Sequence, residues 1–293
     1  MIARACALAA VLGGSAHADV PKLAAVTPDV ALGPHGELYA FDGKAGWLRR
    51  GASTIAGDVA AAPHGLAVTR DGEVFRLARD AWTAVLLSPH AKAIAGAGPR
   101  PLAAIGRAVY ALDGAAPSKL PDAPAPVIAL AGSASGTVIE TDRDVLRLAG
   151  AAWKPIKGAP HHVAALLSDR FALAERGAGV VDLGSGRIVA WPGPLSIAAS
   201  VAVGDTVYAA AVGHGADARG VELLVVRGAK VTREPLAIGP TGSVVAIAAD
   251  ARRVVVALRD GRLLVRASGA WTTYTVRDEP SPQHPGSPPA HSR

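Results

Sequence analysis

The chain has 293 residues, of which half are hydrophobic but only 4% are aromatic, and it carries a formal net charge of +6. Its 33 glycines and 22 prolines are spread along the chain, which excludes a mainly helical protein because both residue types interrupt helices. The mild charge, the scattered basic residues and the scarcity of aromatic side chains argue against nucleic-acid binding, which needs a basic face and stacking platforms.

Residues 1–18 have the features of a signal peptide. An apolar stretch over residues 5–14 is followed by an A-x-A cleavage site that ends at Ala18. This stretch is too short to span a bilayer, and no later stretch is long enough. We therefore expect cleavage before Asp19 and an exported protein, either periplasmic or secreted. The single cysteine, Cys6, lies within this segment, so we expect no disulfide, thiolate nucleophile or cysteine-bound zinc in the mature chain.

A pattern of four short strand-like segments then recurs along the chain. In its clearest copy, residues 58–87, short strand-like segments lie between Gly, Pro or Asp residues. Seven such units have first strands that begin near residues 30, 59, 93, 127, 163, 197 and 244. Units of four strands repeated four to eight times are typical of β-propellers. We predict an all-β fold, a seven-bladed β-propeller of four-stranded antiparallel blades. Six or eight blades are the alternatives, because the unit over residues 93–121 is the weakest.

The units define one propeller domain over residues 19–276. Residues 19–28 precede the first unit and are expected to add a strand near the closure of the ring. Residues 277–293 hold five prolines and no apolar run, a composition typical of a disordered tail.

The stretch DVALGPHGELYAFDG, residues 29–43, resembles the blade opening of NHL propellers, in which a Pro-x-Gly turn joins the first two strands. The Gly-Ala-Trp sequence at residues 269–271 is similar to blades of two-component-regulator-like propellers. The resemblance implies the propeller fold and carries no particular activity with it.

Pro-His-Gly occurs at residues 34–36 and again at residues 63–65. Because Pro fixes φ and Gly relieves strain in tight turns, we interpret both copies as the turn between the first and second strands of adjacent blades. His35 and His64 would then point outward, and a metal or anion site is the alternative.

Three tryptophans, Trp82, Trp153 and Trp271, stand at the start of the outermost strand of their units. We predict that they seal neighbouring blades against each other, and ligand stacking is the alternative.

Candidate site residues gather on the loops that enter first strands and on those that join second to third strands, which we expect to meet at one mouth. Histidine and carboxylate side chains suit zinc or calcium. The candidate ligands of such a divalent metal are Asp29, Asp58, His161, His162 and His214. Loop carboxylates that are candidates for a binding face are Asp42, Asp71, Asp142, Glu175 and Asp260.

The predicted first strands contain no charged residue, so the polar groups lie on loops. We therefore expect a non-catalytic binding or scaffold propeller of the cell envelope, whose partner is a protein or another envelope component. The alternative is a metal-dependent hydrolase or lyase with a loop-built site at one mouth. The sequence leaves enzymatic activity and oligomeric state open.

Overall fold

The computed structural model describes residues 22–41, 47–50, 55, 59–61, 66–69, 71–78, 81–86, 93–98, 100–175, 178–213, 220–238 and 243–276. These residues form strands and turns and no α-helix, so no helix among them could cross a membrane. The predicted signal peptide and tail lie outside the described residues.

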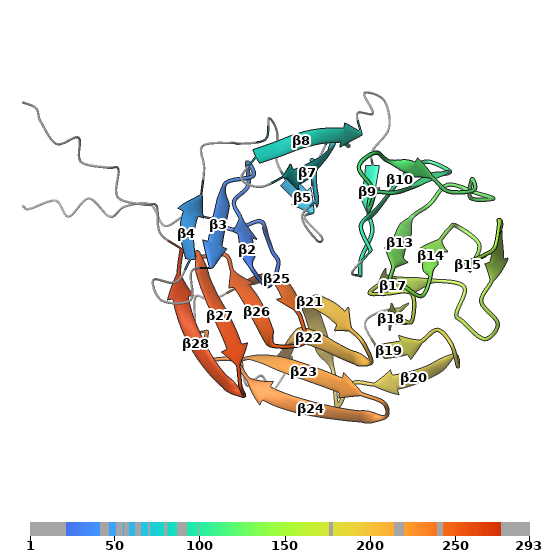
Figure 1. The fold of residues 1–293 in the computed structure, drawn as a ribbon. Coiled ribbons are helices and arrows are strands. Elements are labelled where there is room, and N and C mark those ends of the chain that lie inside the picture. The colour runs from blue at the N-terminus through green and yellow to red at the C-terminus, as the bar shows by residue number, and fades with distance from the viewer. Residues whose placement is uncertain are drawn as a thin grey trace, which may run out of the picture.

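The described strands form seven four-stranded sheets, and in each sheet the strands are antiparallel and consecutive in sequence. Figure 1 shows the sheets arranged as the blades of a propeller, which confirms the predicted fold class. Blades 1 to 3 comprise β1 Ala25–Val26, β2 Val30–Leu32, β3 Leu38–Phe41, β4 Trp47–Arg50; β5 Val59–Ala61, β6 Leu66–Thr69, β7 Val74–Ala78, β8 Ala81–Leu86; β9 Ala93–Ala95, β10 Leu102–Ile105, β11 Ala108–Ala111 and β12 Ser118–Lys119.

Blades 4 to 7 follow the same plan with longer strands towards the C-terminus. They comprise β13 Ala129–Gly132, β14 Thr137–Glu140, β15 Val145–Ala149, β16 Ala152–Pro155; β17 Val163–Leu166, β18 Phe171–Ala174, β19 Gly179–Asp182, β20 Arg187–Ala190; β21 Leu195–Val203, β22 Thr206–Gly213, β23 Val221–Arg227, β24 Lys230–Pro235; β25 Val244–Ala249, β26 Arg253–Leu258, β27 Arg262–Ala267 and β28 Ala270–Thr275.

The hydrophobic core is divided among the joints between blades. The described residues contain seven buried clusters, and each cluster joins residues of two neighbouring blades. One of them packs Trp47 of blade 1 against Val255 and Leu263 of blade 7, so the first and last blades meet. Figure 1 shows these blue and red blades side by side. The ring is therefore closed by side-chain packing.

Strand pleating explains why the inner strands are rich in small apolar residues. Successive side chains of a strand point to opposite faces of the sheet. In β10, Leu102 and Ala104 join the cluster shared with blade 4, whereas Ala103 joins the cluster shared with blade 2. Both faces are buried, so the strand is apolar without alternation.

In blade 1 the sequence-based assignment is wrong by one strand. The segment around Val30, predicted to be the first strand, is the second strand β2, and the short strand β1 pairs with it through Ala25↔Leu32. Trp47 and Leu48 accordingly lie on the fourth strand rather than the third. β1 has two residues, which is too short for a periodic pattern to reveal.

Three tryptophans connect their blades, blades 2, 4 and 7, to the blade before, as predicted. The indole Nε1 of Trp82 in blade 2 donates to Gly36 O of blade 1 at 2.9 Å. The Nε1 of Trp153 in blade 4 donates to Pro121 O, after blade 3, at 2.9 Å. Trp271 packs on the cluster between blades 6 and 7.

Arginines on the third strand of a blade bind the blade that follows. Arg76 of β7 donates to Gly114 O of blade 3 at 2.6 Å. Arg147, at the same place in β15, donates to Asp169 O of blade 5 at 2.9 Å. In blades 2 and 4, the third-strand arginine thus binds the following blade, and the tryptophan binds the preceding blade.

Candidate functional site

The blades present two sets of loops at opposite ends. Because the strands of each sheet are consecutive and antiparallel, first-to-second turns lie at one end, here called the first-turn end. Loops that enter first strands and loops that join second to third strands lie at the other end, here called the second-turn end. The predicted metal ligands and binding-face carboxylates were assigned to the second-turn end, whereas His35 and His64 were assigned to first-to-second turns.

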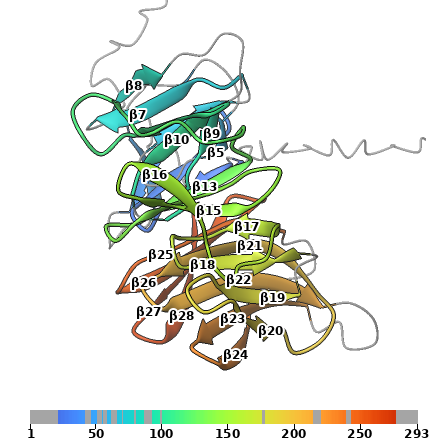
Figure 2. The ribbon, with the colours of Figure 1, turned by 90° about the vertical axis from the view of Figure 1, so that its right-hand side faces the viewer.

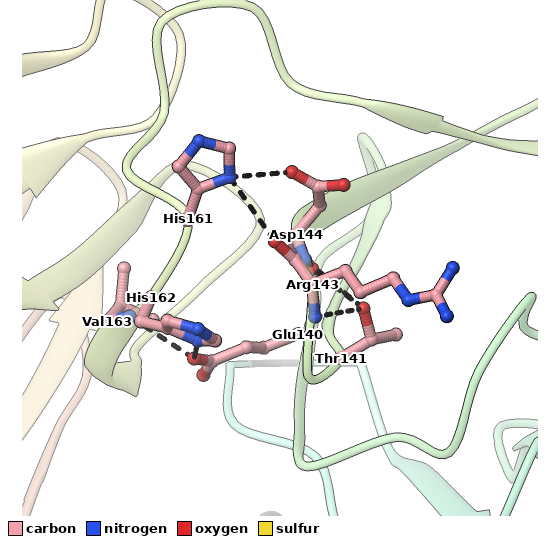
Figure 3. A network of polar contacts seen from close by, with 7 residues as sticks. All are labelled: Glu140, Thr141, Arg143, Asp144, His161, His162 and Val163. Atoms are coloured by element: carbon pink, nitrogen blue, oxygen red, sulfur yellow. Dashed lines mark hydrogen bonds and ion pairs between the residues drawn. The ribbon is translucent and has the colours of Figure 1, made fainter.

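At the second-turn end the structure forms two histidine–carboxylate pairs between blades 4 and 5 (Figure 3). His161, just before β17, places Nδ1 2.9 Å from Asp144 Oδ1 and 3.2 Å from Arg143 O. His162 places Nδ1 3.4 Å from Glu140 Oε1. The sequence identified both histidines but neither of the carboxylates that pair with them.

The two pairs differ in burial. The side chain of Glu140 is only 6% exposed, and its Oε1 also accepts a hydrogen bond of 3.2 Å from the main-chain N–H of Val163. A buried carboxylate needs such partners, because an unpaired charge away from water is costly. The His161 side chain is 83% exposed, so its imidazole is available to solvent. Such pairs can orient an imidazole for proton transfer.

The structure separates the proposed metal ligands. Asp29 follows β1 and lies at the first-turn end, where it forms an ion pair with Arg253 of blade 7. Its expected place beside His161 and His162 was wrong because blade 1 is shifted by one strand. Asp58 and His214 lie outside the described residues. Within the described ranges, no group of three His, Cys, Asp or Glu side chains could hold a metal ion.

Four of the predicted binding-face carboxylates lie on second-to-third loops, as expected: Asp71, Asp142, Glu175 and Asp260. Asp42 is outside the described residues. Asp260 accepts hydrogen bonds from Arg262 Nε at 2.9 Å and Nη2 at 2.6 Å, and Arg262 also donates to Ile238 O. Partial burial acts to raise the pKa of Asp260, but these bonds outweigh it and hold the pKa below its usual value.

The structure describes one of the two Pro-His-Gly segments. His35 lies between β2 and β3, a second-to-third loop, and its N–H donates to Glu37 Oε2 at 2.9 Å. The predicted position between first and second strands was therefore wrong for His35. His64 lies outside the described residues, between β5 and β6.

A pocket lies at the first-turn end of blades 4 to 6, and the sequence did not predict a site there. It has a volume of about 840 Å³ and spans blades 4, 5 and 6; Figure 2 shows blade 4 above blades 5 and 6. Its lining comes from tight turns and one third-strand arginine: Ser133, Ser135, Arg147, Asp169, Arg170 and Asp182. The sequence feature that could have indicated this pocket is the set of turn segments rich in Ser, Asp and Arg.

Polar contacts across blades fix the walls of this pocket. Ser135 Oγ of blade 4 donates to Asp169 Oδ2 of blade 5 at 2.8 Å. Arg170 binds Asp182 Oδ2 at 3.2 Å, and its guanidinium stacks 4.9 Å from the centroid of the Phe171 ring. Partial burial acts to raise the pKa of Asp182, but bonds from Arg170 and from main-chain N–H groups outweigh it and lower the pKa below its usual value.

Solved structures similar to this chain are β-propellers. A catalytically inactive histidine-to-alanine variant of virginiamycin B lyase from Staphylococcus aureus, crystallised with quinupristin, matches with a TM-score of 0.58 and 10% identity, covering 85% of this chain and 95% of that chain. The WD40 β-propeller domain of Doa1 matches with a TM-score of 0.54 and 12% identity, covering 85% and 93%.

The computationally designed protein Ika8 matches with a TM-score of 0.52 and 15% identity, covering 87% of this chain and 90% of that chain. No protein-family model and no curated protein sequence matches the chain. At these identities the similarities establish the fold, and activity has to be argued from the residues.

Proposed function

We propose that this protein is an exported, non-catalytic binding propeller of the cell envelope that holds a protein or another envelope component in the pocket of blades 4 to 6. The observation that carries the proposal is the pocket itself, about 840 Å³ in volume and lined by polar turns of three blades. The signal-peptide features of residues 1–18 support export.

The chemistry of the described lining favours binding over catalysis. It contains no histidine or cysteine. Of its four charged groups, Arg170 and Asp182 are paired with each other, Arg147 donates to the main-chain oxygen of Asp169, and the Asp169 carboxylate accepts from Ser135. Such groups offer hydrogen bonds in fixed directions, which provide specificity towards a polar partner.

The test is a direct comparison of two charge reversals on the purified mature chain. Asp169→Lys changes the pocket wall, and Asp142→Lys changes an exposed carboxylate at the second-turn end. Envelope proteins retained by the wild-type chain are identified, and their affinities are then measured with each variant. We expect Asp169→Lys to abolish binding and Asp142→Lys to leave it unchanged. The reverse result would move the binding face to the second-turn end.

We also propose a second candidate function, a propeller hydrolase or lyase, because the exposed imidazole of His161 is oriented by Asp144. This activity would use His161 and His162 as proton-transfer groups or, together with residues outside the described ranges, as ligands of calcium or zinc. Elemental analysis of protein purified without chelator tests the metal. A bound metal that is lost in His161→Ala would favour the enzyme, whereas a metal-free protein with no activity that depends on these histidines would exclude it.

A further inference from the structure

A cleft between blades 6 and 7 carries an excess of positive charge. Two adjoining pockets of about 230 Å³ and 150 Å³ share Arg227 and Arg266 in their walls. The cationic side chains that line them are Arg227, Lys230, Arg252, Arg253 and Arg266, and the acidic ones are Glu234 and Asp250. Five positive charges thus face two negative charges.

Both acidic groups are already engaged. Asp250 Oδ1 accepts the main-chain N–H groups of Arg252 and Arg253 at 2.7 and 2.8 Å, which shapes the turn before β26. Glu234 Oε1 accepts a bond of 2.8 Å from Arg266 Nη2. Arg253 is engaged as well, because it pairs with Asp29, lies 3.7 Å from Asp250 Oδ2 through its Nε, and covers the ring of Phe41.

Three cations remain without a carboxylate partner among the described residues. Arg227 Nε binds only the Thr206 hydroxyl, at 3.2 Å, and the Arg252 and Lys230 side chains are exposed. In addition, Arg266 Nε is buried and has no hydrogen-bond acceptor among the described residues. A buried donor without a partner is unfavourable, and an acceptor from outside the chain would satisfy it.

A tight hairpin turn lies beside these groups. Ser268, which also lines the cleft, has φ of 50°, the one positive φ of a non-glycine residue in the described part of the chain. Ser268 and Gly269 form the two-residue loop of the β27–β28 hairpin, and positive φ at both residues of such a turn matches the twist of the strands. The turn of Ser268 and Gly269 brings a serine to the cleft wall.

We propose that this cleft binds a compact oxyanion of the phosphate class, either free or as a group on a larger molecule. A phosphate group carries nearly two negative charges and three strong acceptor oxygens. Arg227 and Arg252 supply two uncompensated charges, and Arg266 Nε supplies a directed donor, so the cleft matches a dianion better than a single carboxylate. The cleft shares no lining residue with the pocket of blades 4 to 6, so the inference stands apart from the proposed function.

The experiment titrates the mature protein with inorganic phosphate, sulfate, acetate and glycerol phosphate by calorimetry, at constant ionic strength because salt screens exposed charges. We expect saturable binding of phosphate that is stronger than binding of acetate. A double variant, Arg227→Gln with Arg252→Gln, is expected to weaken phosphate binding by about tenfold or more. Stronger binding of glycerol phosphate than of free phosphate would identify a phosphate group on a larger molecule as the ligand.

The matched control is Arg187→Gln, an exposed arginine on β20 far from the cleft in sequence and in a different blade. This variant should bind phosphate like the wild type, and circular dichroism should show that all variants are folded. Equal phosphate affinity in the double variant and the wild type would overturn the proposal. So would phosphate binding no stronger than that of acetate.

Discussion

At the scale of single residues, the pocket of blades 4 to 6 is held by an aspartate that must be ionised. Asp182 Oδ1 accepts the main-chain N–H groups of Gly184 and Ser185 at 2.9 and 3.2 Å, and Oδ2 accepts from Arg170. These bonds favour the charged carboxylate, which is why its pKa lies below the usual value.

The lowered pKa of Asp182 predicts a particular dependence of stability on pH. A folded-state pKa below the unfolded-state value adds stability at neutral pH, and this contribution is lost as the pH falls through the folded-state pKa. We expect Asp182→Asn to lower the free energy of unfolding at pH 7 and to have a smaller effect below about pH 3. Urea unfolding at both pH values measures this. Asp142→Asn, at an exposed carboxylate, should show no such convergence; an effect of Asp182→Asn independent of pH would contradict the prediction.

At the scale of elements, blades 3 and 4 meet through their main chains. Ala97 N donates to Leu130 O and Gly132 N donates to Ala97 O, both at 2.9 Å, beside the parallel bridge Ala97↔Ala131. This approach requires glycine. Gly98 has φ of 84°, and a Cβ atom there would lie 2.4 Å from Gly132 O. The described main chain thus joins blade 3 directly to blade 4.

Substitution of Gly98 tests this close approach. Gly98→Ala should destabilise the protein by more than the cost of a left-handed backbone, about 1 to 2 kcal/mol, because the methyl group also meets a carbonyl oxygen. Gly106→Ala is the matched control, since its φ is 57° and nothing lies within 4 Å of the added atom. The free energies of unfolding of both variants give the comparison, and equal losses would show that the close contact is not formed.

The sequence predicted the strands that belong to the recurring four-strand unit. It did not predict the contacts that form between separate units. Six of the seven blades lie where the repeats placed them, because each hairpin has its own turn residues. β1 lies within residues 19–28, which were expected to add a strand, but it was not recognised as the first strand of blade 1 because two residues carry no pattern. The pairs of His162 with Glu140 and of His161 with Asp144 depend on the packing of blade 5 on blade 4, which spacing along the chain does not reveal. The pocket turns use Ser and Asp residues that are also common in ordinary turns.

At the scale of the whole molecule, the joint between blades 1 and 7 is built from aromatic side chains, which are otherwise scarce. Phe41 lies 5.3 Å from Trp47 and 5.3 Å from Tyr274 of blade 7, measured between ring centroids. Arg253 covers the Phe41 ring and pairs with Asp29. Aromatic pairs of this kind add to the stabilisation from buried area.

Replacement of the buried Trp47 should open the joint between blades 1 and 7 selectively. Trp47 is completely buried, so Trp47→Ala should cost about 3 to 5 kcal/mol. Hydrogen exchange should then increase mainly in blades 1 and 7. Trp153→Ala, which removes the bond to Pro121, should instead increase exchange in blades 3 and 4. Identical exchange patterns in the two variants would show that the joints do not open separately.

Each sheet is built from one continuous piece of chain, and none of the seven takes a strand from the opposite terminus. During synthesis from the N-terminus, every blade can therefore complete its hydrogen bonds as soon as its own four strands are available. The side-chain packing of blade 1 is completed last, because one of its two faces packs on blade 7, the last to be made. The earliest blade is thus the one whose apolar surface stays uncovered longest, so blade 1 has to avoid other apolar contacts until the ring closes.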